Sequence, residues 1–241
     1  MADDLPPLPV SPRGVRRALI ELDRAAGAAR RGSLLARSRL AARRVGAGLH
    51  LDVHPTVVVG HHVVIETWHE TRSSVVIGEG VRLGDHTWIS MRGGRLTIGR
   101  GTDVRRGVTI NCSGVLEVGE EVVMSTGTHV HCANHIAIGD WTIIGEYSTV
   151  VDSRHIRTDR DAPIHHTTSL GEVTVGRNVW MGAKVTVAAD VHVGDQAIIA
   201  GGAVVTRDVP AGHLAAGVPA RATRALDGGG SAPDVRADPG S

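Results

Sequence analysis

Residues 173–205 read VTVGRNVWMGAKVTVAADVHVGDQAIIAGGAVV, and in this stretch an apolar residue recurs at every sixth position, usually followed by glycine or alanine. The recurring positions are Val175, Met181, Val187, Val193, Ile199 and Val205. Self-similarity at a short fixed period is typical of a β-helix, in which each coil contacts only its neighbours. Three such units make one triangular coil of ~18 residues, so the period predicts an all-β solenoid.

The same period runs through the preceding residues, from about residue 50 onward. We expect successive coils to begin at Val59, Ile77, Ile98, Val118, Ile138, Val175 and Val193. Consecutive starts lie 18 to 21 residues apart, except for the 37 residues between Ile138 and Val175. The extra length predicts an excursion loop over residues 152–172, rich in histidine, arginine and aspartate. Charged side chains gathered in one loop on a rigid scaffold are where function is expected.

The composition suits a narrow β-helix and argues against some partners. Only 2% of the residues are aromatic and phenylalanine is absent, whereas a sandwich or doubly wound core usually needs large aromatic side chains. The formal net charge of +1 predicts no general affinity for nucleic acid. No run of 18 apolar residues is present, so no transmembrane helix is expected. The first residues lack the layout of a signal peptide, and we expect a cytoplasmic protein.

Residues 1–49 are expected to form a helical extension that caps the solenoid. Alanine, leucine and arginine dominate residues 12–46, and the apolar ones recur at helical spacings. Gly27 and Gly32 are expected to divide this helix into two pieces. Solenoids need such caps because an open end exposes sheet edges and apolar interior. The dense arginines favour a solvated basic face, and contact with an anionic membrane surface is the alternative.

The two cysteines, Cys112 and Cys132, each follow a recurring apolar residue by two positions. They should therefore stack on adjacent coils. A disulfide between neighbouring parallel strands would be poorly aligned, and cytosolic thiols stay reduced. We expect two free thiols.

Three stretches of the C-terminal half resemble the hexapeptide-repeat acyltransferases. They are VTVGRNVWMG (173–182), VHVGDQAIIAGGAVVTRDVPAG (191–212) and AGVPARATR (216–224). The likeness is to the branch of galactoside, maltose and xenobiotic O-acetyltransferases. It implies a left-handed parallel β-helix over residues 50–210, a homotrimer, and acetyl-CoA lying between adjacent subunits as the acyl donor. Residues 211–226 would then be a tail that contacts the coenzyme, and residues 227–241 read as a disordered tail.

Transfer of an acyl group from a thioester to a hydroxyl requires a base for the hydroxyl proton, donors for the oxyanion and a site for the coenzyme. Histidine is the natural base, because its ordinary pKa lies near neutrality. In the family the base lies at the start of the excursion loop, and the segment VVDSRH places His155 there. We predict that His155 takes the proton of an acceptor hydroxyl, which attacks acetyl-CoA directly and without a covalent intermediate.

Other groups in or near the loop have less defined roles. Backbone N–H groups rather than side chains are expected to stabilise the oxyanion. His165 and His166, late in the loop, are expected to line or cover the cleft. Asp152, Asp159 or Asp161 could orient the imidazole, and a backbone carbonyl could serve instead.

The resemblance also implies residues that hold the coenzyme. Trp180 would form a wall of the channel beside the thioester, with packing at a coil edge as the alternative. Small residues are needed where the pantetheine arm runs along the coil, and basic residues suit the phosphates. The positions concerned are Ala183, Gly201, Gly202, Thr206, Arg207, Arg221 and Arg224. The arginines could equally be solvated surface residues.

The acceptor side departs from the family pattern. Some relatives hold the acceptor with an asparagine on the preceding coil, where this chain has Ser125. This departure argues against a simple galactoside. We predict a carbohydrate or carbohydrate-bearing acceptor that contacts Ser125, His129, His135 and Asp152. His135 should lie one coil below His155, at the same corner.

Two other functions fit parts of the sequence. His129, His131, Cys132 and His135 could suggest zinc, as in the trimeric γ-class carbonic anhydrases, which share this fold. Alternating strand residues point to opposite sides, so His131 and Cys132 cannot both face one ion, and we expect no metal. A non-catalytic trimeric scaffold is the other alternative, and the presence of His155 together with the coenzyme tail argues against it.

Overall fold

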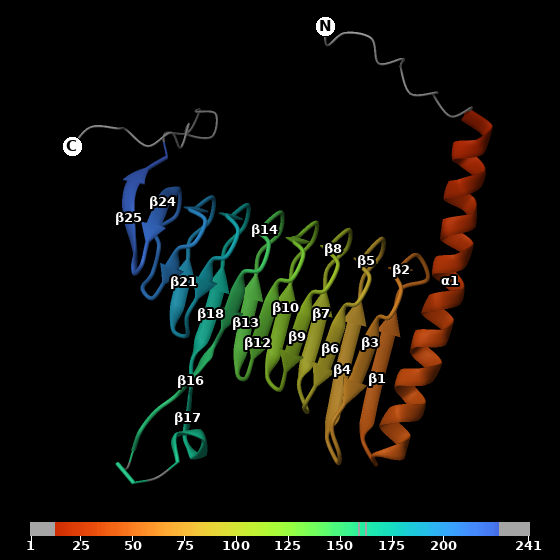
Figure 1. The fold of residues 1–241 in the computed structure, drawn as a ribbon, viewed down its shortest axis with the longest axis horizontal. Coiled ribbons are helices and arrows are strands. Elements are labelled where there is room, and N and C mark those ends of the chain that lie inside the picture. Colours follow the sequence, from red (N-terminus) through yellow and green to blue (C-terminus); the bar gives the residue numbers. More distant parts are fainter. Residues whose placement is uncertain (1–12, 159, 162, 227–241) are drawn as a thin grey trace, which may run out of the picture.

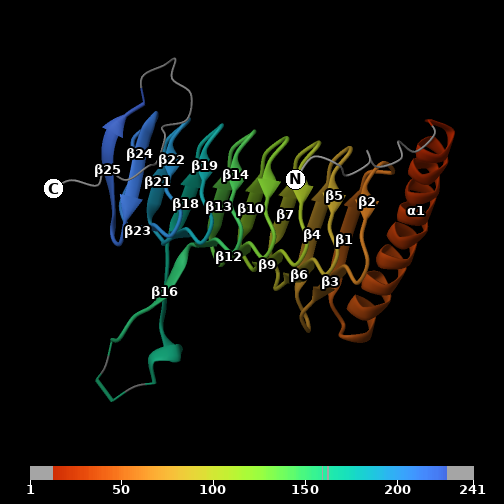
Figure 2. The same ribbon diagram turned by 45° about the horizontal axis from the view of Figure 1, so that its top comes forward.

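The protein folds into a long parallel β-solenoid that one helix closes at its N-terminal end (Figure 1). The computed structural model describes residues 13–158, 160–161 and 163–226. Three sheets run along the solenoid, and each of the seven coils contributes one strand to every sheet. Figure 2 shows the strands of successive coils side by side. The fold confirms the predicted parallel β-helix and is consistent with the left-handed winding that the resemblance implies.

Through the seven coils the strands of sheets 1, 2 and 3 follow one another in rotation, with the arm strands β16 and β17 inserted before β18. Sheet 1 contains β1 (Gly48–Val53), β4 (Arg72–Ile77), β7 (Arg95–Ile98), β10 (Val115–Val118), β13 (His135–Ile138), β18 (Glu172–Val175) and β21 (Val191–Val193). Sheet 2 contains β2 (Val58–Val59), β5 (Arg82–Leu83), β8 (Asp103–Val104), β11 (Val123–Met124), β14 (Ile143–Ile144), β19 (Trp180–Met181), β22 (Ile198–Ile199), β24 (His213–Gly217) and β25 (Ala220–Ala225). Sheet 3 contains β3 (Val64–Thr67), β6 (Trp88–Met91), β9 (Thr109–Cys112), β12 (His129–Cys132), β15 (Thr149–Val151), β20 (Thr186–Val187) and β23 (Val204–Val205).

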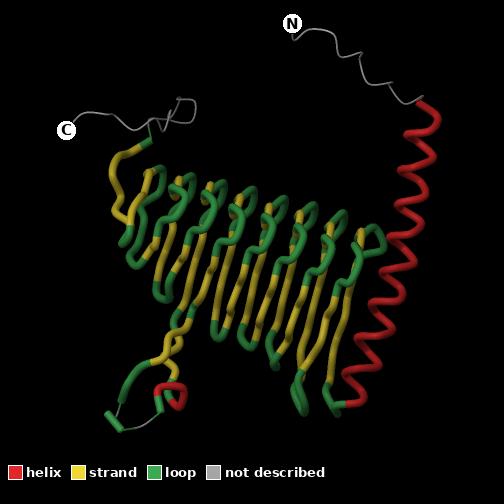
Figure 3. The backbone as a smooth tube through the Cα atoms, in the orientation of Figure 1, coloured by secondary structure: helices red, strands yellow, loops and turns green. Residues whose placement is uncertain are grey.

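Turns between the sheets stack into edges, which Figure 3 draws in green. The 2–3 edge, where the chain passes from sheet 2 to sheet 3, consists of residues 60–63, 84–87, 105–108, 125–128, 145–148, 182–185 and 200–203. The 3–1 edge, where it returns to sheet 1, includes residues 68–71, 92–94, 113–114, 133–134, 152–171 and 188–190. These two edges carry the residues of functional interest.

The recurring apolar residues form the core, as the period predicts. Ile77, Ile98 and Ile138 of sheet 1 are at most 2% exposed. The glycine that often follows a recurring residue is required by the stacking of coils. A Cβ added to Gly145 would lie 2.4 Å from the backbone carbon of Gly182 on the next coil, so a side chain there would collide with the neighbouring turn.

One of the predicted coil starts is wrong. Val53, not Val59, pairs with Ile77 in sheet 1, and Val59 pairs with Leu83 in sheet 2. The first coil is longer than the others because the turn 68–71 is followed by a six-residue strand. Counting back one regular coil from Ile77 therefore reaches a residue of sheet 2 instead of sheet 1. The later predicted coil starts all lie in sheet 1.

Helix α1 (Arg13–Arg44) is continuous, so the predicted break at Gly27 and Gly32 is wrong. A helical glycine costs only ~1 kcal/mol relative to alanine, which packing can offset. Gly27 lies against the first coil, where an added Cβ would be 3.5 Å from Val58 Cγ1. The buried side chains of Leu34, Ser38 and Ala42 show how closely the helix packs on the solenoid.

Arginines of α1 satisfy carbonyl groups at the open end of the solenoid. Arg30 Nε donates to Val59 O (2.5 Å), Arg31 Nη1 to Val57 O (3.0 Å) and Arg39 Nη2 to Leu51 O (3.3 Å). The predicted cap is confirmed, but its arginines do more than form a solvated face, because three of them occupy backbone acceptors. Across residues 13–158, 160–161 and 163–226, no helix combines the length and the apolar character needed to span a bilayer.

Cys112 and Cys132 pair in register on β9 and β12, which confirms that they stack on adjacent coils. Both are buried and free. The Cys112 thiol, burial and the nearby Asp152 carboxylate all raise the pKa of Cys132, so this thiol stays protonated.

Two segments depart from the regular coil. The arm, residues 152–171, comprises β16 (Ser153–His155), the 3₁₀ helix η1 (Ile164–His166) and β17 (Thr168–Leu170), and it projects away from the solenoid (Figure 1). Near the C-terminus, β24 pairs in parallel with β22 and in antiparallel with β25. The expected coenzyme tail thus extends sheet 2, while Asp159 and the expected disordered tail lie outside the described residues.

Candidate active site

The arm leaves the solenoid through a fixed neck at Asp152, whose side chain is fully buried. Its two carboxylate oxygens accept the backbone N–H groups of Ala133 and Asn134, each at 2.7 Å. Its own backbone oxygen accepts the N–H of Gly171 at 2.7 Å, which closes the neck. The predictions that Asp152 contacts the acceptor or orients His155 are not supported, because both carboxylate oxygens already serve the turn below.

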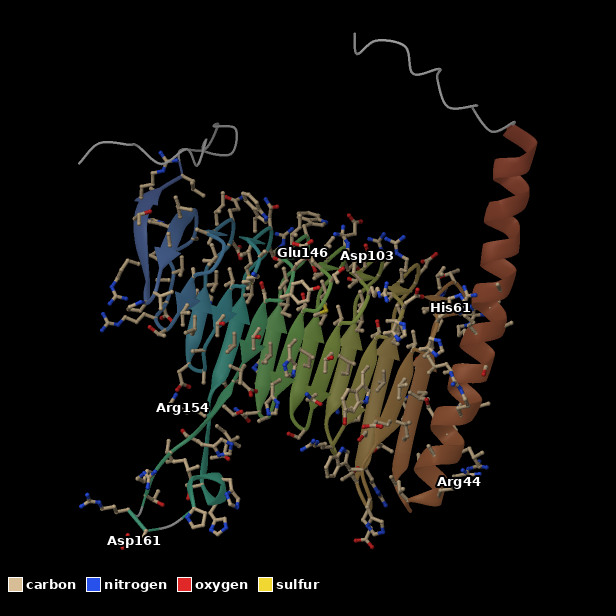
Figure 4. The ribbon with its side chains drawn as sticks, viewed as in Figure 1. Arg44, His61, Asp103, Glu146, Arg154 and Asp161 are labelled. Carbon is tan, nitrogen blue, oxygen red and sulfur yellow. The ribbon has the colours of Figure 1, made fainter. Side chains whose placement is uncertain are left out.

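An ion pair ties the base of the arm to the following coil. Arg154 Nη1 lies 2.6 Å from Asp190 Oδ2, and this hydrogen bond lowers the pKa of Asp190. Figure 4 labels Arg154 where the arm meets the solenoid and Asp161 near the tip of the arm. The neck and the ion pair together fix the direction in which the arm projects.

His155 is exposed and ends β16, opposite Thr168 in the antiparallel pair with β17. Its Nδ1 lies 3.4 Å from Thr168 Oγ1. When Nδ1–H is donated to this hydroxyl oxygen, the lone pair of the ring is on Nε2, the tautomer that a base requires. His165 and His166 lie further out on η1, exposed, with their rings 4.6 Å apart.

Of the other predicted acceptor residues, His135 lies near the neck and Ser125 does not. His135 is in register with Glu172, the first residue after the arm, and its Nε2 is 3.4 Å from Glu117 Oε2. It therefore lies on the same edge as the arm, one strand away. Ser125 is buried on the 2–3 edge, so the structure does not bring its side chain together with His135.

His129 lies on the outward side of sheet 3. Asn111 Nδ2 donates to His129 Nε2 at 3.0 Å. Burial, and then the neighbouring His131, lower the pKa of His129, which favours the neutral ring as a hydrogen-bonding group. The outward face of sheet 3, at the end of β12 nearer the 2–3 edge, is therefore polar and preorganised.

The small residues assigned to the coenzyme gather on the 2–3 edge near the C-terminal end. Gly202 N–H donates to Ala183 O at 2.8 Å. A Cβ added to Gly201 would approach the same oxygen to 3.2 Å, and Gly202 has a φ of +73°, which favours glycine. The two coils therefore stack without side chains between them and leave an open, narrow strip.

Trp180 lies on sheet 2, directly before this strip, and is 44% exposed. It belongs to an apolar row that crosses five coils on the outer face of sheet 2. The row consists of Val123, Ile143, Trp180, Ile198 and Leu214, each in register with the next. Ile143 is 42% exposed, so this face is apolar and uncovered in a single chain.

The predicted phosphate-binding residues lie at the C-terminal end of the solenoid. Thr206 and Arg207 follow β23, and Arg221 and Arg224 lie on β25, all of them exposed. None of the three arginines forms an ion pair with another residue of the described part of the chain. They remain available to an anionic group.

The imidazole and the small-residue strip lie on different edges of one chain. The arm leaves the 3–1 edge, the strip occupies the 2–3 edge, and sheet 3 separates them. A crossing of three or four strand residues at ~3.3 Å each is ~10–13 Å. In Figure 4, Glu146 marks the 2–3 edge at the upper margin, and Arg154 marks the base of the arm below.

The zinc alternative gains no support from the side chains. On β12 the side chain of His131 is half-buried on the outer face, whereas that of Cys132 is in the core. In the part of the chain that the structure describes, no three histidine, cysteine or acidic side chains are placed to hold a metal ion.

Sequence reasoning missed several residues of this region, among them Thr168, Asn111 and Asp190. Each acquires its partner only through pairing across the arm or between coils. The six-residue period locates the coil of each residue but does not say which polar side chains meet.

The repeats are similar to those of known proteins. The bacterial transferase hexapeptide family (six repeats) matches residues 172–207. The galactoside O-acetyltransferase of Escherichia coli (strain K12) is 31% identical over 119 residues, which are 44% of this chain and 59% of that protein. The bifunctional protein GlmU of Stenotrophomonas maltophilia (strain K279a) is 28% identical over 190 residues, 71% of this chain and 40% of that protein. The chain thus spans less than two thirds of either relative.

The chain was also compared with solved structures. The hexapeptide-repeat acetyltransferase of Vibrio cholerae, complexed with acetyl-CoA, aligns over 87% of this chain and 90% of its own, with 22% sequence identity and a TM-score of 0.40.

Proposed function

We propose that this chain, which carries the hexapeptide repeat of bacterial transferases, transfers an acetyl group from acetyl-CoA to a hydroxyl group of a carbohydrate or a carbohydrate-bearing metabolite. The observation that carries the proposal is the pair of edges described above. One edge presents an exposed imidazole on a fixed arm, and the other offers an uncovered strip that ends near unpaired arginines.

In the proposed reaction His155 Nε2 accepts the proton of the acceptor hydroxyl while its oxygen attacks the thioester carbonyl. The new C–O bond forms first, and the C–S bond breaks as the tetrahedral intermediate collapses. His155 then returns the proton to the leaving thiolate, so coenzyme A departs as the thiol. Backbone N–H groups stabilise the oxyanion, and Thr168 Oγ1 accepts Nδ1–H to hold the tautomer.

The strip formed by Ala183, Gly201 and Gly202 would take the pantetheine arm, with Trp180 beside the thioester. This path requires no side chain to move, because the turns present backbone groups directly. The coenzyme phosphates would meet the basic residues at the end of the solenoid, where the forked guanidinium suits phosphate. These basic residues are Arg221 and Arg224, while Thr206 and Arg207 would lie near the adenine end of the coenzyme.

The separation of the two edges supports a homotrimer. A base on the 3–1 edge of one chain reaches a coenzyme on the 2–3 edge of a neighbouring chain more directly than one on its own. A contact between two different edges is heterologous, and three triangular prisms joined in this way close into a ring. Each of the three clefts would then contain one arm and one strip.

Uncovered apolar side chains favour the same assembly. The outer row on sheet 2 includes Ile143 and Trp180, both more than 40% exposed. The arm buries none of the residues of η1, and its Ile164 and Leu170 are 44% and 56% exposed. Apolar patches of this kind mark interaction sites, and a second copy of the chain would cover both.

A sugar acceptor is supported by polar side chains at both ends of the proposed cleft: His135 lies beside the neck, and His129 and Asn111 lie on the outer face of sheet 3. The relative from Escherichia coli is by its name a galactoside acetyltransferase. A base at His155 would serve a sugar amine as well as a hydroxyl. An activity assay with both kinds of acceptor therefore distinguishes oxygen from nitrogen as the atom that is acetylated.

The test combines binding with turnover. Acetyl-CoA at 100 times its dissociation constant should stabilise the protein by ~2.7 kcal/mol, measured as a shift in melting temperature. A screen of neutral, acidic and amino sugars with thiol detection then identifies the acceptor. If acetyl-CoA does not shift the melting temperature and no acceptor causes thiol release, the proposal is wrong. The non-catalytic scaffold would then be the better explanation.

A further inference from the structure

A shallow groove of about 450 Å³ follows the 3–1 edge on the N-terminal side of the arm. Two arginines, Arg72 and Arg95, line it together with serine and glycine residues of successive turns. None of the lining residues is acidic. Apart from the two arginines and Val115, the groove is lined by serine and glycine only, so it is open and cationic.

The groove lies on the same edge as the arm, three strands away from it. Arg95 is in register with Val115, Val115 with His135, and His135 with Glu172, which directly follows the arm. Three strand spacings of ~4.8 Å place Arg95 ~14 Å from the neck. A molecule bound at His155 and lying along this edge would reach the groove without turning a corner.

An indole held in a fixed position lies on the same edge, in the turn that precedes the groove. Trp68 opens the turn that leads to Arg72, and its Nε1 donates to Ser90 Oγ at 3.2 Å. The guanidinium carbon of Arg92 lies 3.9 Å from the centroid of its ring. Although Trp68 is held by these contacts, it remains 49% exposed, so part of the ring is free to contact a ligand.

The arginines at and beside the groove lack the carboxylate partners that arginines elsewhere on the solenoid have. Arg82 and Arg100 bond to Asp103 and Glu120. In the described part of the chain, Arg72, Arg92 and Arg95 form no ion pair.

Two acidic side chains on the strand and turn that precede the groove have partners elsewhere. Glu66 accepts from Ser90 Oγ at 3.2 Å, and Glu70 lies 3.7 Å from His69 Nδ1. The groove therefore presents positive charge that this chain does not neutralise.

We infer that this groove binds an anionic part of the saccharide acceptor, with Arg95 ~14 Å along the edge from the neck of the arm that carries His155. This inference rests on the proposed function. Arginine forks bind carboxylate and phosphate through paired hydrogen bonds, and an exposed indole offers an apolar face to a sugar or a base. The negative charge comes either from acidic sugars of an oligosaccharide or from the diphosphate of a sugar nucleotide.

The experiment measures binding by titration calorimetry without acetyl-CoA. The probes are tetragalacturonate, UDP-glucose and the neutral maltotetraose. The proteins are the wild type, Arg72→Gln/Arg95→Gln, Trp68→Ala, and Arg100→Gln as a matched arginine on another edge. Melting temperatures with and without acetyl-CoA are recorded for each protein, which shows that the variants fold and retain the donor site.

We expect the wild type to bind at least one anionic probe more tightly than maltotetraose, and less tightly as salt is raised. The double arginine variant should weaken that binding at least tenfold, which is ~1.4 kcal/mol, and Trp68→Ala should weaken it as well. Arg100→Gln should bind as the wild type does. Binding of tetragalacturonate alone identifies an acidic glycan, and binding of UDP-glucose alone identifies a diphosphate.

Three results would overturn the inference: no anionic probe binds, maltotetraose binds equally well, or the arginine variant binds as the wild type does. If acetyl-CoA still raises the melting temperature in these cases, the proposed function stands and only the groove assignment fails. Anionic binding without any effect of acetyl-CoA would instead reject the proposed function and leave a saccharide-binding groove.

Discussion

The imidazole of His155 is held from behind by Thr168, whose Oγ1 lies 3.4 Å from Nδ1 across the antiparallel pair at the base of the arm. The two residues are 13 positions apart in the chain. The contact depends on the neck at Asp152 and on the ion pair between Arg154 and Asp190, which fix where the pair begins. The orientation of the proposed base is thus set by main-chain pairing.

Replacement of Thr168 tests this positioning role. Thr168→Val should lower kcat ~3- to 10-fold with little change in KM, because one hydrogen bond of ~1 kcal/mol is lost. Thr168→Ser should restore most of the activity. His155→Ala should lower kcat ~10²- to 10⁴-fold. A Thr168→Val enzyme with unchanged kcat and an unchanged pH profile would show that the hydroxyl does not hold the ring.

Mixed trimers test whether two chains share one site. His155→Ala lacks the base, and Ala183→Trp puts an indole into the coenzyme strip, so each should be inactive alone. Co-expressed and purified as mixed trimers, they should recover about one third of wild-type activity per subunit, because one of the three heterologous clefts in each mixed trimer holds both intact residues. The measurement is thiol release by complexes purified through two different tags. If the co-assembled trimers stay as inactive as either parent, each site is built within one chain.

Asp152 should be essential to stability. Asp152→Ala leaves the partly buried N–H groups of Ala133 and Asn134 without their acceptors, at a cost of ~2–5 kcal/mol. Asp195 accepts the exposed Arg177 N–H at 2.8 Å and serves as the matched control. Asp195→Ala should cost less than ~1 kcal/mol. Urea unfolding of both variants measures the difference, and equal losses would contradict a structural role for the neck.

His129 should make the protein less stable in acid. Its folded-state pKa is lowered by burial and by His131, so the unfolded chain binds this proton at a higher pH than the folded chain does. Stability should therefore fall as the pH drops below the ordinary value of 6.5, and level off below the folded-state pKa. The urea midpoint of His129→Gln should change less between pH 7.5 and 5.5 than that of the wild type. His69→Gln, at an exposed position, should behave as the wild type, and identical slopes in all three proteins would refute the assignment.

The register of the solenoid was predictable wherever the coil kept its length. From Ile77 to Val193 the recurring residues pair as expected. The prediction failed at Val59, because the longer turn 68–71 shifts the count by one side of the triangle. A period is a local signal, and an insertion at one turn cannot be distinguished from a missing coil before the pairing is known.

The sequence pointed to the arm, whereas its internal contacts came only from the structure. From the sequence, Asp152 was predicted to contact the acceptor or to orient His155. In the structure it is buried, and its carboxylate accepts two backbone N–H groups. Nothing in the sequence pointed to Thr168, because its position opposite His155 results from the antiparallel pairing of β16 and β17 within the arm. Gly27 suggested a break in α1 that packing on the first coil prevents.

The amino-acid sequence by itself determined the solenoid, its helical cap and the stacking of Cys112 and Cys132 on adjacent coils. A six-residue period requires only that apolar and small residues recur locally along the chain. Only the tertiary structure decided that His155 and the Ala183 strip lie on different edges, and that Arg72 and Arg95 face an open groove. These relationships depend on how many residues fill each turn, and a single altered turn rotates everything that follows around the axis of the solenoid.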